Sequence, residues 1–182
     1  MRFAFILFII MLPIISFSQT EVDINNFDEE LLAKLLLEKV NEERVKKKLT
    51  KLIDNDYLKQ AASNHSIYQA KKNKMTHRQT SSKTKTPRNR VEKYGGKFKL
   101  IGENVAYSDI GTPVNMKVQN KLKLFETNTY EKIAELIFLG WKHSPSHYAN
   151  IIHKPYNSSG LSIKLTKDGS RIYATHVFGT TF

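Results

Sequence analysis

The sequence contains no cysteine, and it has a single tryptophan, five prolines and eight glycines among its 182 residues. Without cysteine the chain can form neither disulfides nor thiolate metal sites, and it offers no cysteine for lipid attachment. An exported protein of this composition must rely on its hydrophobic core for stability. Apolar residues make up 40% of the chain, which excludes a disordered tail and favours one globular domain.

Long hydrophobic runs are also absent after residue 18, so we expect no transmembrane segment in the mature chain. The first 18 residues combine Arg2, an uncharged apolar stretch over 3–15, and small residues before Gln19, as in a secretory signal peptide. As a helix, that stretch would span only about 20 Å, short of a bilayer core of roughly 30 Å. We therefore expect cleavage before Gln19 and a secreted or periplasmic protein.

Acidic residues are scarce relative to basic ones, with 17 Asp and Glu against 29 Lys and Arg and a net charge of +12. The excess is concentrated in residues 71–99, which hold eleven Lys and Arg and a single Glu. We expect a long loop here, with a short helix around 89–94. It could be a solvated loop, a contact surface for anionic lipid or envelope polymer, or a nucleic-acid site. The predicted binding residues on it are Lys83, Lys85, Arg88 and Arg90.

Nucleic acid is the least favoured of these partners for the basic segment. Only Tyr94 and Phe98 interleave with its cations, no recognition motif is present, and the export signal argues against it. An anionic partner on the cell envelope fits the charge, since a run of cations concentrates polyanions in a salt-dependent way.

The remaining pattern predicts helices followed by an antiparallel pair, which is typical of an α+β fold. Helical periodicity covers 28–46, with Asn26 and Glu29 resembling a capping box, and 54–72. A third helix starts after Asn128 as its cap, and a fourth starts at Ser144. A hairpin joins 160–165 to 171–178. We assign residues 19–27 to a linker and 28–182 to the domain.

Five short strings carry a family resemblance when they are taken in order. They are NEER at 41–44, KMTH at 74–77, GENVA at 102–106, WKHSPSHYANI at 141–151 and YATHVFG at 173–179. Together they resemble the CAP superfamily, or SCP domain, named for cysteine-rich secretory proteins, antigen 5 and pathogenesis-related 1 proteins. The resemblance implies an α-β-α sandwich with a central cleft, in the cysteine-free bacterial branch.

The resemblance also implies that His77, Glu103 and His147 lie together in that cleft as candidate catalytic residues. A further glutamate found in many eukaryotic relatives, shortly after the tryptophan of the third helix, has no counterpart after Trp141. His77 and His147 are the candidate metal ligands, and a divalent metal such as Zn²⁺ is the candidate cofactor.

The residues themselves support a similar hypothesis for His147. It falls in the first turn after Ser144, where the helix dipole disfavours imidazolium, and a neutral imidazole suits a metal or a general base. Two histidines and a carboxylate could hold Zn²⁺ with one open position. However, these residues are far apart in sequence, with no His-Glu-x-x-His helix to fix them.

Structural roles compete with functional ones for several of these residues. Glu103 could accept backbone N–H groups and close a turn, and Asn104 fits a structural hydrogen bond. His65 lies among apolar helix residues and is expected to pack in the core. His176 could line the cleft or pack.

Three functions remain open from the sequence. The leading one is a binding module whose cleft takes a lipid, sterol-like, peptide or divalent-metal ligand. The alternative is a metal-assisted hydrolase of envelope or extracellular polymers, with Glu103 or a histidine as general base. The third is a surface interaction protein that works through the basic segment 71–99.

Overall fold

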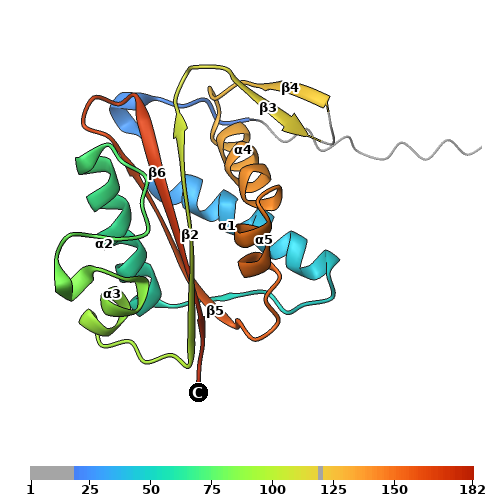
Figure 1. The fold of residues 1–182 in the computed structure, drawn as a ribbon. Helices are drawn as coiled ribbons and strands as arrows, with labels where there is room; N and C mark the ends of the chain where they lie inside the picture. The colour runs from blue at the N-terminus through green and yellow to red at the C-terminus, as the bar shows by residue number, and fades with distance from the viewer. Residues whose placement is uncertain (1–18, 119–120) are drawn as a thin grey trace, which may run out of the picture.

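A computed structural model describes residues 19–118 and 121–182, so the predicted signal peptide over 1–18 lies outside the described residues. The chain forms an α+β fold in which helices cover both faces of a four-stranded sheet (Figure 1). The predicted α-β-α sandwich is therefore confirmed. The helices are α1 (Glu29–Lys46), α2 (Asp56–Lys72), α3 (Pro87–Lys93), α4 (Tyr130–Lys142) and α5 (Pro145–Ile151).

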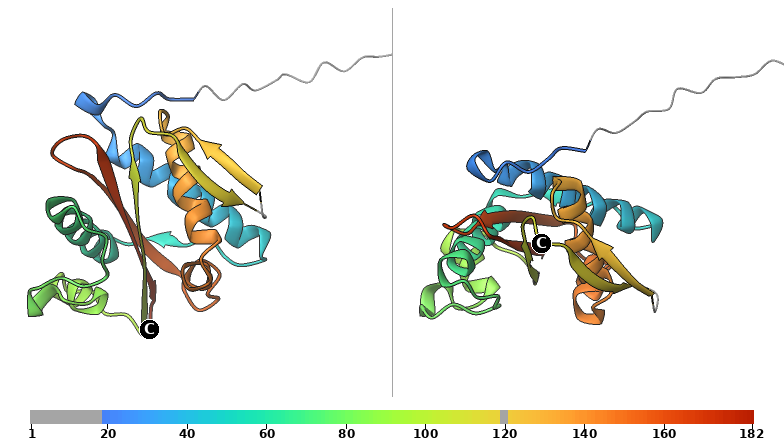
Figure 2. Two further views of the ribbon diagram at one scale, coloured as in Figure 1. Left: turned by 45° about the horizontal axis from the view of Figure 1, so that its top comes forward. Right: turned by 90° about the horizontal axis from the view of Figure 1, so that it is seen from above.

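The main sheet has the strand order β1-β5-β6-β2. Its strands are β1 (Ile53–Asp54), β2 (Leu100–Asp109), β5 (Ser158–Leu165) and β6 (Arg171–Thr180), and only the β1–β5 pair is parallel. The predicted hairpin is β5–β6, and Gly169 turns it with φ of +71°. A separate two-stranded sheet pairs β3 (Val114–Val118) with β4 (Lys121–Phe125) beside α4 (Figure 2).

Two hydrophobic cores hold the layers together. The larger core packs α1, α4 and α5 against one face of the sheet, and the smaller one packs α2 and α3 against the other. The alanines of α2 allow a very close approach to β5. A Cβ on Gly160 would lie only 2.0 Å from the backbone nitrogen of Lys59, so a side chain at 160 would force this helix off the sheet.

Two predicted helix caps are wrong by a residue or two. Asp28, not Asn26, caps α1 by accepting a 2.8 Å hydrogen bond from the Leu31 amide, because Asn26 belongs to a preceding 3₁₀ turn. Thr129, not Asn128, caps α4 through the amide of Lys132.

The predicted linker (19–27) contacts the rest of the domain, and the predicted basic loop (71–99) contains regular secondary structure. In the segment 19–27, the Val22 amide donates to the Asn128 carbonyl at 2.9 Å. In the basic segment, a 3₁₀ turn covers Ser82–Thr84 and α3 begins at Pro87, earlier than expected. The reason is a capping box between Thr86 and Asn89, with proline favoured in the first turn.

Two residues of the NEER sequence, Asn41 and Arg44, hydrogen-bond the backbone of the loop after α1 and of the segment around the end of α5. Arg44 is fully buried, and its guanidinium donates to the carbonyls of Thr50, Ile151, His153 and Tyr156 at 2.7–3.1 Å. Asn41 accepts the Leu52 amide at 2.8 Å. Among the described helices, none has both the length and the apolar character needed to cross a bilayer.

Candidate functional site

Glu103 is the centre of the site, and it lies on β2 opposite Val177 of β6. The alternative that it closes a turn is therefore wrong. Only 1% of its side chain is exposed, so its charge needs partners inside the protein. Arg90 from α3 forms an ion pair with Oε2, and His77 Nδ1 lies 3.0 Å from Oε1.

Arg90 is fully buried, so it cannot belong to the exposed basic surface to which the sequence assigned it. Besides Glu103, its guanidinium donates to the carbonyl of Thr84 at 3.0 Å. The other three predicted surface cations, Lys83, Lys85 and Arg88, are exposed on the 3₁₀ turn and α3. Arg90 instead connects the basic segment to the buried carboxylate.

The side chain of His77 is half-exposed. The loop that carries it is held in place by a residue of α2, His65. His65 is buried as predicted, and its Nε2 lies 2.5 Å from the Thr76 carbonyl. Gln79 Nε2 lies 3.1 Å from His65 Nδ1, which assigns the proton to Nε2 in the neutral ring. Burial lowers the pKa of His65 to about 4. His65 is thus a positioning residue for the His77 loop, a role that sequence reasoning missed.

His147 on α5 lies beside His77, with ring centroids 6.2 Å apart. Its helix is tied to β2, because Asn104 donates to the His147 carbonyl at 3.0 Å and Asn150 donates to Asn104 at 2.9 Å. Asn104 therefore has the structural role considered for it. The pKa of His147 is lowered, mainly by burial and then by His77, which differs from the predicted cause.

The structure thus brings the three predicted cleft residues together. Within the described ranges, no group of three or more His, Cys, Asp or Glu is arranged to hold a metal ion. Both carboxylate oxygens of Glu103 are already engaged, one by Arg90 and one by His77. Glu103 therefore orients His77 from behind and offers no free oxygen, which leaves the two imidazoles as the remaining donors of the predicted site.

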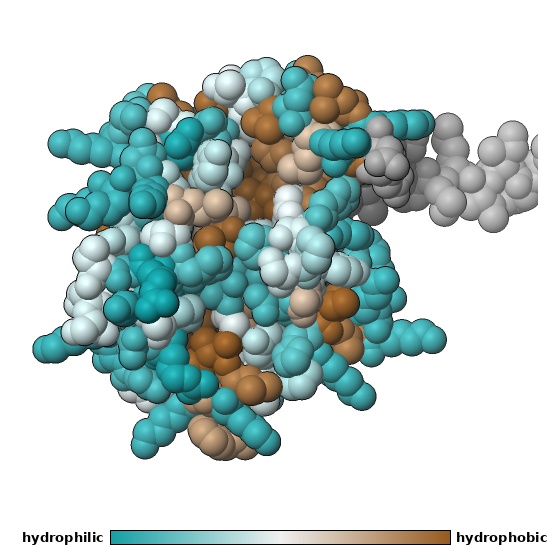
Figure 3. All heavy atoms as spheres, viewed as in Figure 1, coloured by the Kyte–Doolittle hydropathy of each residue, from teal (hydrophilic) through white to brown (hydrophobic). Residues whose placement is uncertain are grey.

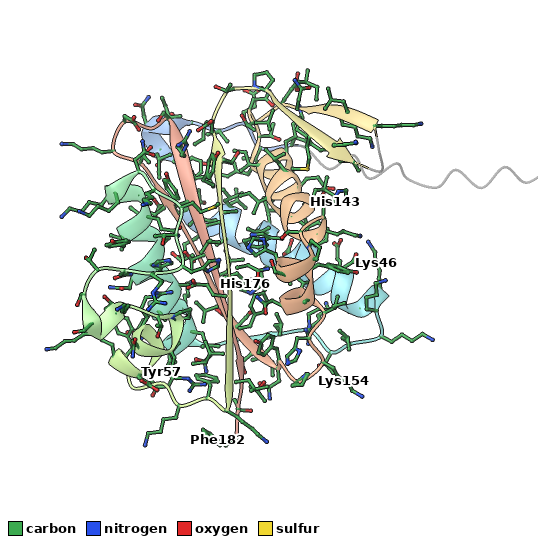
Figure 4. The ribbon with its side chains drawn as sticks, viewed as in Figure 1. Lys46, Tyr57, His143, Lys154, His176 and Phe182 are labelled. Atoms are coloured by element: carbon green, nitrogen blue, oxygen red, sulfur yellow. The ribbon has the colours of Figure 1, made fainter. Side chains whose placement is uncertain are left out.

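His176 packs in the interior and does not line the cleft (Figure 4). It is fully buried, and neither ring nitrogen has a hydrogen-bond partner among the described residues. Its ring centroid lies 4.0 Å from that of Phe178 and 6.0 Å from that of Trp141. Burial lowers the pKa of His176 to about 3, so the ring is neutral at physiological pH.

An apolar groove of about 350 Å³ adjoins the histidine pair. Apolar atoms gather in this hollow over α4 and beside β3 (Figure 3). His147 is one of its walls, so the groove and the histidine pair are continuous. Most of the lining side chains are apolar and come from β2, β3 and α4: Val105, Ala106, Val114, Met116, Leu136, Ile137 and Trp141. The polar side chains of the lining, besides His147, are those of Tyr107, Ser108 and Asp109 at the end of β2.

The sequence predicted a lipid-binding cleft but not the residues that line this groove, because no motif marks them. One feature of the sequence does indicate the groove: Gly140 interrupts the apolar face of α4, and it lines the groove next to Trp141. Trp141 itself is held by a 3.0 Å hydrogen bond from Nε1 to the Val105 carbonyl.

Comparison with known proteins matches a family model described as the cysteine-rich secretory protein family to residues 37–178. No curated protein matches the chain. Among solved structures, an outer surface protein from Borrelia burgdorferi has a TM-score of 0.64 at 21% identity, covering 91% of this chain and 100% of that one.

Two further bacterial structures share the fold. An extracellular protein containing an SCP domain from Bacillus anthracis has a TM-score of 0.61 at 20% identity, covering 84% of this chain and 41% of that one. A cysteine-rich secretory protein from Staphylococcus aureus has a TM-score of 0.55 at 18% identity, covering 85% of this chain and 40% of that one. At these identities the likeness concerns the fold alone.

Proposed function

Because the chain belongs to the cysteine-rich secretory protein (CAP) family, we propose that it is an extracellular or periplasmic binding protein for lipids. The observation that carries this proposal is the apolar groove continuous with the histidine pair. Ligand sites are commonly apolar hollows with a few polar groups that fix orientation. Aliphatic walls suit an acyl chain.

The charges near the groove favour an acyl chain that ends in an anionic group, because Asp109, the one carboxylate of the lining, is already paired with Arg171 at 2.5 Å. Met75 lines the groove, and Lys74 before it is exposed, as is Arg78 three positions after it. Neutral His147 adds a hydrogen-bonding group at the groove wall. A fatty acid is therefore the simplest probe of this site.

Filling the groove from Gly140 should abolish fatty-acid binding. Gly140 lines the groove on α4, and a Cβ placed there lies 3.8 Å from Cε of Met116, so Gly140→Leu would project into the hollow. We expect palmitate affinity, measured by titration calorimetry, to fall by at least about tenfold. The free energy of unfolding should not decrease, since glycine costs a helix about 1 kcal/mol.

The matched control is Gly140→Ala, which adds one methyl group at ordinary contact distance and leaves most of the groove open. It should bind palmitate like the wild type. Equal affinity in Gly140→Leu would show that the ligand binds elsewhere, and absence of binding in the wild type would refute the lipid proposal.

A divalent ion is a second candidate ligand, favoured by the adjacent rings of His77 and His147. Such an ion would supply a Lewis acid, which is also what the hydrolytic alternative requires. We expect micromolar Zn²⁺ binding that is lost in His77→Ala/His147→Ala and retained in His143→Ala, because His143 is exposed and outside the pair. Titration calorimetry measures both. Binding unchanged by the double substitution would remove these histidines as ligands.

The exposed cations Lys83, Lys85 and Arg88 support a third candidate, a contact surface for anionic envelope polymer. From Tyr57 to Val91 the sequence contains no acidic residue, and the nearest ion pair, Arg88 with Glu92, is long at 4.0 Å. Replacing these three cations by glutamine should abolish salt-dependent binding to an anionic polymer, and unchanged binding would rule out this candidate.

A further inference from the structure

The β3–β4 hairpin presents leucines to solvent on the face opposite the groove. Val114 and Met116 line the groove from β3, and Asn115 and Lys117 alternate with them on the other face. Leu124 pairs with Asn115 and Leu122 pairs with Lys117, so both leucines share that outer face. Leu122 is 71% exposed and Leu124 is 62% exposed.

The position of β4 at the edge of its sheet does not by itself explain the exposure of the two leucines. Lysines on an edge prevent strands of other molecules from adding, and Lys121 and Lys123 could serve that purpose. Exposed leucines have the opposite effect, because they favour association with other molecules. Two adjacent exposed leucines on one face therefore indicate a surface that meets an apolar partner.

The charge of the hairpin indicates what kind of partner it is. Lys117, Lys121 and Lys123 are exposed, and none of them forms an ion pair among the described residues. The acidic residues at the base of the hairpin are neutralised elsewhere, Asp109 by Arg171 and Glu126 by Lys132. Lys117 shares the face of the two leucines, whereas Lys123 pairs with Met116 and Lys121 pairs with Val118 on the other face of this thin hairpin. All three side chains are exposed at the hairpin and remain available to an anionic surface.

We propose that the outer face of the β3–β4 hairpin docks the protein on an anionic lipid bilayer. The leucines would enter the headgroup–acyl boundary with Lys117 beside them at the level of the anionic headgroups. Lys121 and Lys123 would reach the headgroups from the other face, because long lysine side chains can extend around an exposed edge strand. The hairpin lies beside α4 at the edge of the molecule, where a flat surface can reach it (Figures 1 and 2). Docking needs no ligand in the groove, so this proposal stands independently of lipid binding there.

Vesicle flotation tests the docking. The purified protein should float with vesicles of phosphatidylglycerol and phosphatidylcholine and should not float with phosphatidylcholine alone. Leu122→Ser/Leu124→Ser should weaken the binding by at least about tenfold, since two leucine side chains lose their apolar contact. Replacing Lys117, Lys121 and Lys123 by glutamine should also weaken it and should reduce its salt dependence.

Two controls separate the hairpin from other surfaces. Leu100→Ser removes a leucine that is 39% exposed elsewhere, and it should bind like the wild type. The glutamine variant of Lys83, Lys85 and Arg88 should keep leucine-dependent binding. Wild-type binding by the double leucine variant, loss only in the glutamine variant of the α3 cations, or equal binding to both vesicle types would each overturn the proposal. Palmitate binding by the double leucine variant should be unchanged, which distinguishes a failed docking proposal from a failed groove proposal.

Discussion

Glu103→Ala should lower the free energy of unfolding by about 3–5 kcal/mol, because it leaves the buried Arg90 guanidinium without its counter-ion. Arg90 is fully buried, and its Nε already lacks a hydrogen-bond partner among the described residues. The carbonyls of Thr84 and His77, to which the guanidinium also donates, are uncharged and cannot replace a carboxylate. Urea unfolding followed by circular dichroism measures this change.

Two comparison variants give this prediction its specificity. Arg90→Met/Glu103→Leu removes both charges and should recover a large part of the lost stability, since apolar residues can replace a buried ion pair. Glu126→Ala breaks the pair with Lys132 at the surface, and it should cost far less than Glu103→Ala because solvent screens an exposed ion pair. If Glu103→Ala cost no more than Glu126→Ala, the buried pair would not be a main stabilising contact.

Acid should destabilise the fold strongly between pH 6.5 and pH 4, because two buried histidines resist protonation. The folded pKa is lowered to about 4 for His65 and about 3 for His176, whereas an unfolded histidine titrates near pH 6.5. Below pH 6.5 protons therefore bind the unfolded chain preferentially. Each histidine removes up to about 1.4 kcal/mol per pH unit, giving a combined loss of roughly 5 kcal/mol by pH 4.5.

The pH profile can be assigned to particular residues. His176→Leu should flatten the slope of the unfolding free energy below pH 6.5 by up to about half, because His65 remains and the pKa of His147 is lowered as well. A slope that stays the same in His176→Leu would show that His176 does not titrate on unfolding.

Much of the fold follows from local patterns that the sequence carries. Leu32, Leu36 and Val40 repeat at helical spacing and are all buried in α1. The Asp168-Gly169 pair marks the β5–β6 turn, where glycine adopts a positive φ. The caps were misplaced because several residues near each helix start could act as caps, and only the backbone conformation selects one of them.

The site itself is only partly predictable, because it depends on register and on long-range packing. Arg88 and Arg90 have the same side chain and similar neighbours in sequence, yet α3 starting at Pro87 places the first outside and the second inside. His65 has no motif of its own, and its role appears only where its ring meets the Thr76 carbonyl. The β3–β4 hairpin was not predicted, although apolar residues alternate with polar ones in both β3 and β4, which is the pattern of a strand.

Quenching of Trp141 fluorescence by a brominated fatty acid tests the central claim most directly. Trp141 is the single tryptophan of the chain and lines the groove, so its emission reports on that place alone. We predict saturable quenching in the wild type and in Gly140→Ala, and none in Gly140→Leu. Fatty-acid binding without quenching in the wild type, or equal quenching in Gly140→Leu, would contradict the assignment of this groove as the ligand site.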